Sequence, residues 1–129
     1  MIVVDSSVWI GQSRGADTRA VSQLNEVIDE NEIIVGDLVL LEVLQGARDD
    51  RHALRLERTL RQFPVETMLD EALAVKAATN YRMLRTRGVT VRTTIDLIIA
   101  TFCVDRGHGL LHDDRDFEAM AIPLGLTIV

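Results

Sequence analysis

The segment "LLHDDRDF", residues 110–117, joins an apolar run to a cluster of acids. Three aspartates, Asp113, Asp114 and Asp116, stand within four positions, with Arg115 among them. A short apolar run that ends in such a turn is typical of a buried strand that leads into a helix. Because like charges at this spacing repel one another, the segment needs either a positive partner or a structural use for the charge.

Short apolar runs followed by helical segments recur along the chain. This alternation predicts an α/β fold in a single domain over residues 1–129, with a central parallel sheet of four to five short strands flanked by helices. In such sheets, ligands bind beyond the carboxyl ends of the strands. We expect strands at residues 1–5, 32–36, 64–68, 108–112 and 125–129. We expect helices at 6–13, 17–31, 37–47 (with Asp37 as N-cap), 49–63, 69–88 (capped at Asp70 and stopped at Gly88), 93–107 and 114–124.

Composition narrows the class of protein. Hydrophobic residues make up 47% of the 129 residues, and no apolar run approaches the roughly 18 residues that a membrane span needs. The formal net charge of −6 argues against a simple basic DNA-binding module. The one cysteine, Cys103, cannot form an internal disulfide, which favours a buried structural thiol and a cytoplasmic setting.

Two acids outside the quoted segment have both a structural and a functional interpretation. Asp5 directly follows the first expected strand, so it stands at a carboxyl end, but aspartate is also a favoured helix cap. Glu42 interrupts the apolar segment "LVLLEVLQ", where an unpaired buried carboxylate would be costly. Its spacing from Gln45 and Asp49 also permits a polar strip that faces water. The pattern of residues alone leaves both alternatives open.

Asp96 is harder to explain as a surface residue. In "TTIDLIIATFC", the residues three, four and seven positions further on are Ile99, Ala100 and Cys103. These positions share a helix face with Asp96, and an apolar face is expected to point inward. A position near the helix N-terminus would stabilise the carboxylate through the helix dipole. The functional interpretation is therefore favoured for Asp96.

The acids of the quoted segment exceed what one helix start requires. Asp113 and Asp116 have the spacing of a helix N-cap and its third residue, which leaves Asp114 without a role. Carboxylates that converge at strand ends repel unless a cation lies among them, and Mg²⁺ or Mn²⁺ prefers such oxygen ligands. Zinc is disfavoured, because the histidines, His52, His108 and His112, are scattered and show no ligand spacing with Cys103.

Taken together, these motifs resemble a known family. The N-terminal strand ending in "DSS", the helical "LLEVLQG", the "TTIDLIIA" helix and the terminal "LLHDDRDF" look like the PIN-domain nucleases, and more narrowly like the VapC-type toxins of bacterial toxin–antitoxin pairs. The match extends over essentially the whole chain, in order. The family pattern at the last motif usually reads Thr-Asn-Asp-x-Asp-Phe, and this chain has His112 and Asp113 in place of the threonine and asparagine.

The resemblance implies a function and a set of site residues. It implies a metal-dependent endoribonuclease that hydrolyses RNA phosphodiester bonds at a carboxylate-bound Mg²⁺, which Mn²⁺ could replace. It also implies a cognate antitoxin and a homodimer, with no membrane association. Two alternatives are a housekeeping RNA-processing PIN nuclease and a non-catalytic PIN module that binds nucleic acid or protein. The implied catalytic and metal-binding residues are Asp5, Glu42, Asp96, Asp114 and Asp116, with Ser7, Arg92 and Arg115 in support.

Overall fold

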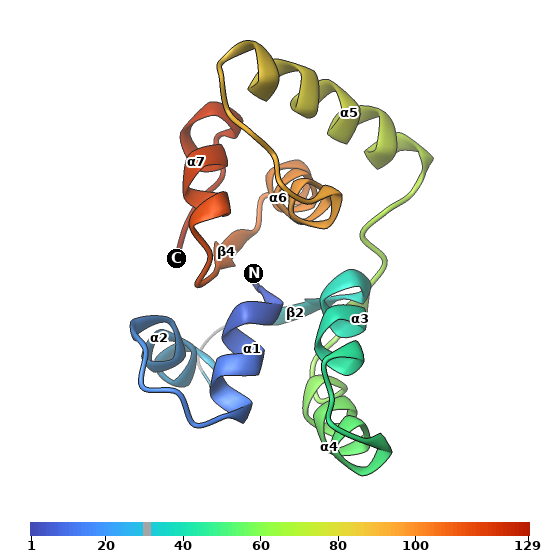
Figure 1. Cartoon of the computed structure of the whole chain (residues 1–129), viewed down its shortest axis with the longest axis vertical. Helices are drawn as coiled ribbons and strands as arrows, with labels where there is room; N and C mark the ends of the chain where they lie inside the picture. Colours follow the sequence, from blue (N-terminus) through green and yellow to red (C-terminus); the bar gives the residue numbers. More distant parts are fainter. Residues whose placement is uncertain (30–31) are drawn as a thin grey trace.

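A parallel sheet forms the centre of the fold (Figure 1). The computed structural model describes residues 1–29 and 32–129, and within them the strands are ordered β3-β2-β1-β4. All three strand pairs are parallel, which confirms the predicted α/β class. The strands are β1 (Ile2–Val4), β2 (Ile33–Gly36), β3 (Val65–Glu66) and β4 (Gly109–Leu111). The strand expected over 125–129 is reduced to one bridge, between Leu110 and Ile128.

Helices cover the sheet, with α5, α6 and α7 in the upper half of Figure 1 and α1 to α4 in the lower half. The helix expected over 17–31 begins after a Thr18 cap and ends at Val27, and its last two expected residues, 30 and 31, lie outside the described residues. The helices are α1 (Ser6–Ser13), α2 (Arg19–Val27), α3 (Asp37–Gln45), α4 (Asp50–Leu60), α5 (Glu71–Thr86), α6 (Thr94–Arg106) and α7 (Arg115–Leu124).

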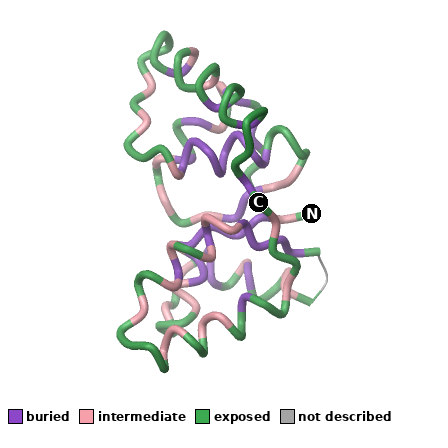
Figure 2. Tube along the Cα trace, turned by 90° about the vertical axis from the view of Figure 1, so that its right-hand side faces the viewer, coloured by how far each residue is buried: buried purple, intermediate pink, exposed green. Residues whose placement is uncertain are grey.

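The core lies where the two groups of helices meet the sheet, as the buried segments of Figure 2 show. Strands β1 and β2 read "IVV" and "IIVG" and are buried almost throughout, as expected for central strands covered on both faces. Helix α6 is buried along most of its length, from Asp96 to Cys103. No described helix is both long enough and apolar enough to span a membrane.

The start of α3 differs from the prediction. Asp37 is not the N-cap; Gly36 holds that position, and Asp37 is the first helical residue. The Asp37 carboxylate accepts a hydrogen bond of 3.0 Å from the N–H of Met68 instead. The side chain therefore ties α3 to the segment after β3, a contact that local sequence cannot reveal because the two residues are 31 positions apart.

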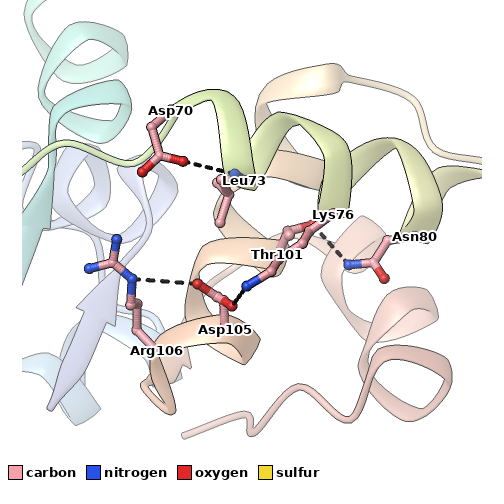
Figure 3. Close-up of polar contacts among 7 residues, drawn as sticks. All are labelled: Asp70, Leu73, Lys76, Asn80, Thr101, Asp105 and Arg106. Carbon is pink, nitrogen blue, oxygen red and sulfur yellow. Dashed lines mark hydrogen bonds and ion pairs between the residues drawn. The ribbon is translucent and has the colours of Figure 1, made fainter.

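Helix α5 packs against α6 through polar contacts that Figure 3 shows. Asn80 donates a hydrogen bond of 3.1 Å to the hydroxyl of the buried Thr101, and Lys76 forms an ion pair with Asp105 one helical turn further along α6. The carboxylate of Asp70 caps α5 as predicted, accepting from the N–H of Leu73. The contacts of Asn80 and Lys76 join α5 to α6, whose first turn carries Asp96.

Candidate metal centre

The acids of the site come from the ends of neighbouring elements. Asp5 directly follows β1, and Asp114 follows β4, whose Leu111 pairs with Val4 of β1. The N–H of Asp5 donates to the Leu111 carbonyl at 2.9 Å, which holds the two strand ends side by side. Asp96 lies in the first turn of α6. In the sheet, β2 and β3 lie on one side of β1, and β4 lies on its other side. Ligand sites in parallel sheets form where the strand order reverses in this way.

Three carboxylates, here called the acid triad, approach one another closely: Asp96, Asp114 and Asp116. One oxygen from each lies within 4.8 Å of the other two, a spacing that a shared cation could bridge. Asp96 is only 8% exposed, and the other two are half-buried. Two members of the triad open onto a pocket of about 550 Å³. That pocket is lined by Arg92, His112, Asp113, Asp114, Arg115, Asp116 and Glu118.

Asp5 lies beside the triad and is the most buried acid of the site, at 3% exposure. Its Oδ2 atom accepts two hydrogen bonds from Ser7, one from the hydroxyl at 2.6 Å and one from the backbone N–H at 3.1 Å. Its Oδ1 atom is buried and has no hydrogen-bond partner among the described residues. Burial raises the pKa of Asp5, and the nearby Asp114 raises it further. A buried, unpaired carboxylate oxygen is costly unless it has a cationic partner.

Glu42 reaches the same region from α3. Its Oε1 atom accepts a hydrogen bond of 3.1 Å from the hydroxyl of Ser6, and the side chain is half-buried. Burial raises the pKa of Glu42, and the charges of Asp5, Asp96 and Asp114 raise it further. Glu42 therefore belongs to the same electrostatic cluster as the triad, and it does not lie in a polar strip separate from the site.

The pKa of Asp96 reflects the burial and the repulsion between carboxylates that a bound cation would offset. Burial, together with the charges of Asp5, Asp114 and Asp116, raises the pKa of Asp96 to about 6, although the hydroxyl of Thr93 lowers it. Every donor atom of the cluster is a carboxylate oxygen, which suits a hard divalent cation better than zinc. The mutual repulsion and the unpaired Asp5 oxygen both fit such an ion. Asp96, Asp114 and Asp116 would hold it, with Asp5 and Glu42 next to them.

Hydroxyl groups around the acids fix their positions. The Ser7 hydroxyl that donates to Asp5 also accepts from the N–H of Asp113 at 3.1 Å, so one side chain joins the loops after β1 and β4. In the sequence analysis we identified Ser7 but missed two other hydroxyl groups. The hydroxyl of Ser6 donates to Glu42, and the hydroxyl of Thr93 accepts from the N–H of Asp96. Thr93 could have been found as a threonine in the N-cap position of a predicted helix.

The start of α7 corrects the expected acidic capping box. Asp114, and not Asp113, is the N-cap, and its carboxylate accepts a hydrogen bond of 3.0 Å from the N–H of Asp116. Asp113 is exposed and lies outside the triad, although it lines the pocket. Asp114, which the expected capping box left without a role, is therefore the N-cap of α7 and also a member of the triad.

Two arginines add positive charge to the pocket. The Arg92 Nε atom lies 3.5 Å from Asp116 Oδ1, and its side chain is largely exposed. Arg115 lines the same pocket, and the ion pairs of the described residues include none between Arg115 and the aspartates beside it. Both side chains are placed to meet an anionic group that enters the pocket.

Comparisons with known proteins agree with this geometry. The PIN domain family model matches residues 2–123. Ribonuclease VapC11 of Mycobacterium tuberculosis is 32% identical over 124 residues, which cover 94% of this chain and 92% of that protein. The chain therefore belongs to the PIN-domain family and, within it, to the VapC ribonucleases, as the sequence motifs predicted.

Solved structures share the fold over nearly the whole chain. VapBC2 from Rickettsia felis, bound to a DNA fragment from its promoter, matches with a TM-score of 0.78 and 16% identity, covering 100% of this chain and 98% of that one. VapC20 of Mycobacterium tuberculosis, described as a toxin that cleaves the sarcin-ricin loop, matches with a TM-score of 0.68 and 17% identity, covering 92% and 94%. At these identities the likeness concerns the fold.

Proposed function

We propose that this protein is a metal-dependent endoribonuclease of the VapC type, the toxin of a toxin–antitoxin pair. The observation that carries the proposal is the convergence of five acids at one end of the sheet, with the triad oxygens within 4.8 Å and a buried unpaired oxygen on Asp5. The kinship with proteins named VapC ribonucleases supports RNA as the substrate. We further propose that residues 1–129 act as a single PIN-like domain.

We assign each side chain a role that fits its position. Asp96, Asp114 and Asp116 hold Mg²⁺, which Mn²⁺ can replace, and Asp5 completes the negative site. When bound, such an ion lowers the pKa of a water molecule and stabilises charge on the leaving oxygen of a phosphodiester. Glu42, with its raised pKa and its place outside the triad, is suited to accept a proton from the attacking water. Arg92 and Arg115 orient the RNA phosphate in the pocket.

The proposal can be tested by mapping new RNA ends. Purified protein is incubated with total cellular RNA, with Mg²⁺ or with a chelator, and new 5′ ends are sequenced. An Asp96→Asn variant serves as the inactive enzyme, and Asp17→Asn, which changes an exposed aspartate that does not line the pocket, serves as the matched control. We expect discrete ends that need both the metal and Asp96 and that persist in the control. A folded, antitoxin-free sample that makes no metal-dependent ends would refute the nuclease and favour a binding module.

Partners and location are inferred from the same kinship. We propose a cognate antitoxin of the VapB type, since the structurally similar chain from Rickettsia felis is found in a VapBC2 complex. We also propose a homodimer that forms through an apolar groove between α5 and α6, of about 450 Å³, whose lining includes the exposed Leu69 and Tyr81. A cytoplasmic setting suits both an RNA substrate and the free, buried thiol of Cys103.

A further inference from the structure

His112 lies in the loop that joins β4 to α7. It directly follows Leu111, the last residue of β4, and it lines the pocket beside the triad. Its Nδ1 atom accepts a hydrogen bond of 3.1 Å from the backbone N–H of Asp114. Its ring packs against the fully buried Phe117 of α7, with 5.3 Å between the ring centroids. Two independent contacts therefore hold the imidazole in one orientation.

The hydrogen bond acts on a residue with two functions. Asp114 contributes an oxygen to the triad, and it is also the N-cap that begins α7 and receives the N–H of Asp116. The backbone at Asp114 is extended, with φ −141° and ψ 123°, so nothing in the helix holds its N–H. Nδ1 of His112 supplies that partner. Fixing the Asp114 backbone thus sets the direction of its own carboxylate and the start of the helix that carries Asp116.

The contact also defines what His112 does not do. An Nδ1 atom that accepts an N–H has its lone pair engaged, so this nitrogen is not free to bind a metal ion in this conformation. The neighbouring Asp113 is held in a parallel way, because its N–H donates to Ser7 Oγ. The loop after β4 is therefore fastened at two successive backbone N–H groups, one by Ser7 and one by His112.

We propose that His112 is a positioning residue for the metal centre: through Nδ1 it holds the Asp114 backbone so that the triad keeps its geometry. This inference rests on the proposed metal-binding function. Groups that orient metal ligands in this manner typically change metal affinity by about 10- to 100-fold when removed.

Three substitutions separate the acceptor from the ring. His112→Asn places an amide oxygen near the position of Nδ1 and can accept the Asp114 N–H. His112→Phe keeps a ring against Phe117 but has no acceptor. His112→Gln is polar, but its amide lies one bond further out, nearer the position of Nε2. We expect the Kd for Mn²⁺, measured by calorimetry, to rise about 10- to 100-fold in the Phe and Gln variants. The Asn variant should stay within a few-fold of the parent protein.

Each outcome has a defined meaning. The positioning role is overturned if the Phe and Gln variants bind Mn²⁺ as tightly as the parent, or if the Asn variant is as weak as they are. Thermal unfolding in chelator checks that each variant folds. If the Phe variant does not fold, the Gln variant, which has no acceptor at the position of Nδ1, replaces it. A parent protein that binds no Mn²⁺ would instead refute the metal centre, and with it this inference. A parent that binds Mn²⁺ but leaves RNA intact would refute only the nuclease.

Discussion

The carboxylate of Asp96 lies in the first turn of α6, almost buried and within 4.8 Å of oxygens from Asp114 and Asp116. Local sequence explains part of this placement. The apolar face shared with Ile99, Ala100 and Cys103 turns Asp96 inward, and the structure buries all four. A helix N-terminus offsets only part of the cost of burying a charge, so the folded protein tolerates Asp96 for a reason other than stability.

Replacing Asp96 should stabilise the metal-free protein. Asp96→Asn removes a charge that burial and three neighbouring acids disfavour, so we expect the free energy of unfolding in chelator to rise by about 1 kcal/mol, or roughly 3–6 °C in Tm. The same change should remove most of the increase in Tm that Mn²⁺ gives the parent protein. Differential scanning fluorimetry with and without Mn²⁺ measures both effects. Asp17→Asn, as the control, should show neither effect, because Asp17 is exposed and does not line the pocket. A lower Tm for metal-free Asp96→Asn would contradict this expectation.

The raised pKa values of Asp5, Glu42 and Asp96 predict how stability depends on pH. The folded state binds protons on these acids more tightly than the unfolded state does. The metal-free protein should therefore lose stability as pH rises from about 4 through the Asp96 pKa of about 6. With Mn²⁺ the trend should oppose this, because metal binding requires the deprotonated acids. Tm measured from pH 4.5 to 7.5 tests the sign, and Asp96→Asn should flatten the metal-free profile.

At the residue scale, sequence reasoning was strongest where chain position determines location. Residues that directly follow neighbouring parallel strands must lie at one edge of the sheet, which is why Asp5 and Asp114 could be placed together in advance. It was weakest where a side chain's direction depends on a distant element. The bonds from Ser6 to Glu42 and from Asp113 to Ser7 each join separate elements. That the acids bind a metal stays a prediction, which the calorimetry above tests.

At the scale of elements, helix ends were predicted well where a single residue decides them. Gly107 ends α6 with a φ of +69°, in the left-handed region that favours glycine. Asp70 begins α5 as its N-cap. Predictions erred where tertiary contacts compete with local preference. Asp37 bonds to Met68 and does not cap α3, and the expected last strand makes only one bridge to β4.

Two glycines at helix ends offer a matched test of that argument. A Cβ at Gly107 would meet nothing within 4 Å, so the cost of Gly107→Ala is conformational, and we expect a loss of about 1 kcal/mol in the free energy of unfolding. Gly46 ends α3 with a φ of −83°, where any residue fits without strain. Gly46→Ala should therefore leave stability unchanged or raise it by about 0.5 kcal/mol. Urea unfolding measures both, and equal losses in the two variants would refute the conformational explanation.

At the scale of the whole molecule, the sheet topology brings together acids that lie far apart in the sequence. Acids from near both ends of the sequence meet because β1 and β4 are neighbours, although more than 100 residues lie between Asp5 and Asp114. The alternation of strands and helices predicted this class of sheet correctly. It could not supply the order β3-β2-β1-β4, because that order depends on how the crossovers pack. Convergence at the carboxyl ends of the strands did not depend on that order, and the family resemblance, confirmed by the comparisons, supplied the class of protein.

The apolar groove between α5 and α6 leads to a prediction about assembly. Ala74, Ala78 and Tyr81 repeat at helical spacing along the groove between α5 and α6, and Leu69 lies at its edge. Leu69 is 44% exposed and Tyr81 is 42% exposed, so a second copy of the chain could bury both. We expect the purified protein to sediment as a dimer, and Tyr81→Glu to make it a monomer, because the substitution removes an aromatic side chain from the groove and places a charge in the interface.

The control for this prediction is another exposed apolar residue. Ile122 on α7 is 92% exposed and does not line the α5–α6 groove, so Ile122→Glu should leave the sedimentation coefficient unchanged. Neither substitution touches the acid triad, and both variants should therefore bind Mn²⁺ with the affinity of the parent protein. A parent that sediments as a monomer would refute the dimer. A dimer that survives Tyr81→Glu but is broken by Ile122→Glu would move the interface from α5 to α7.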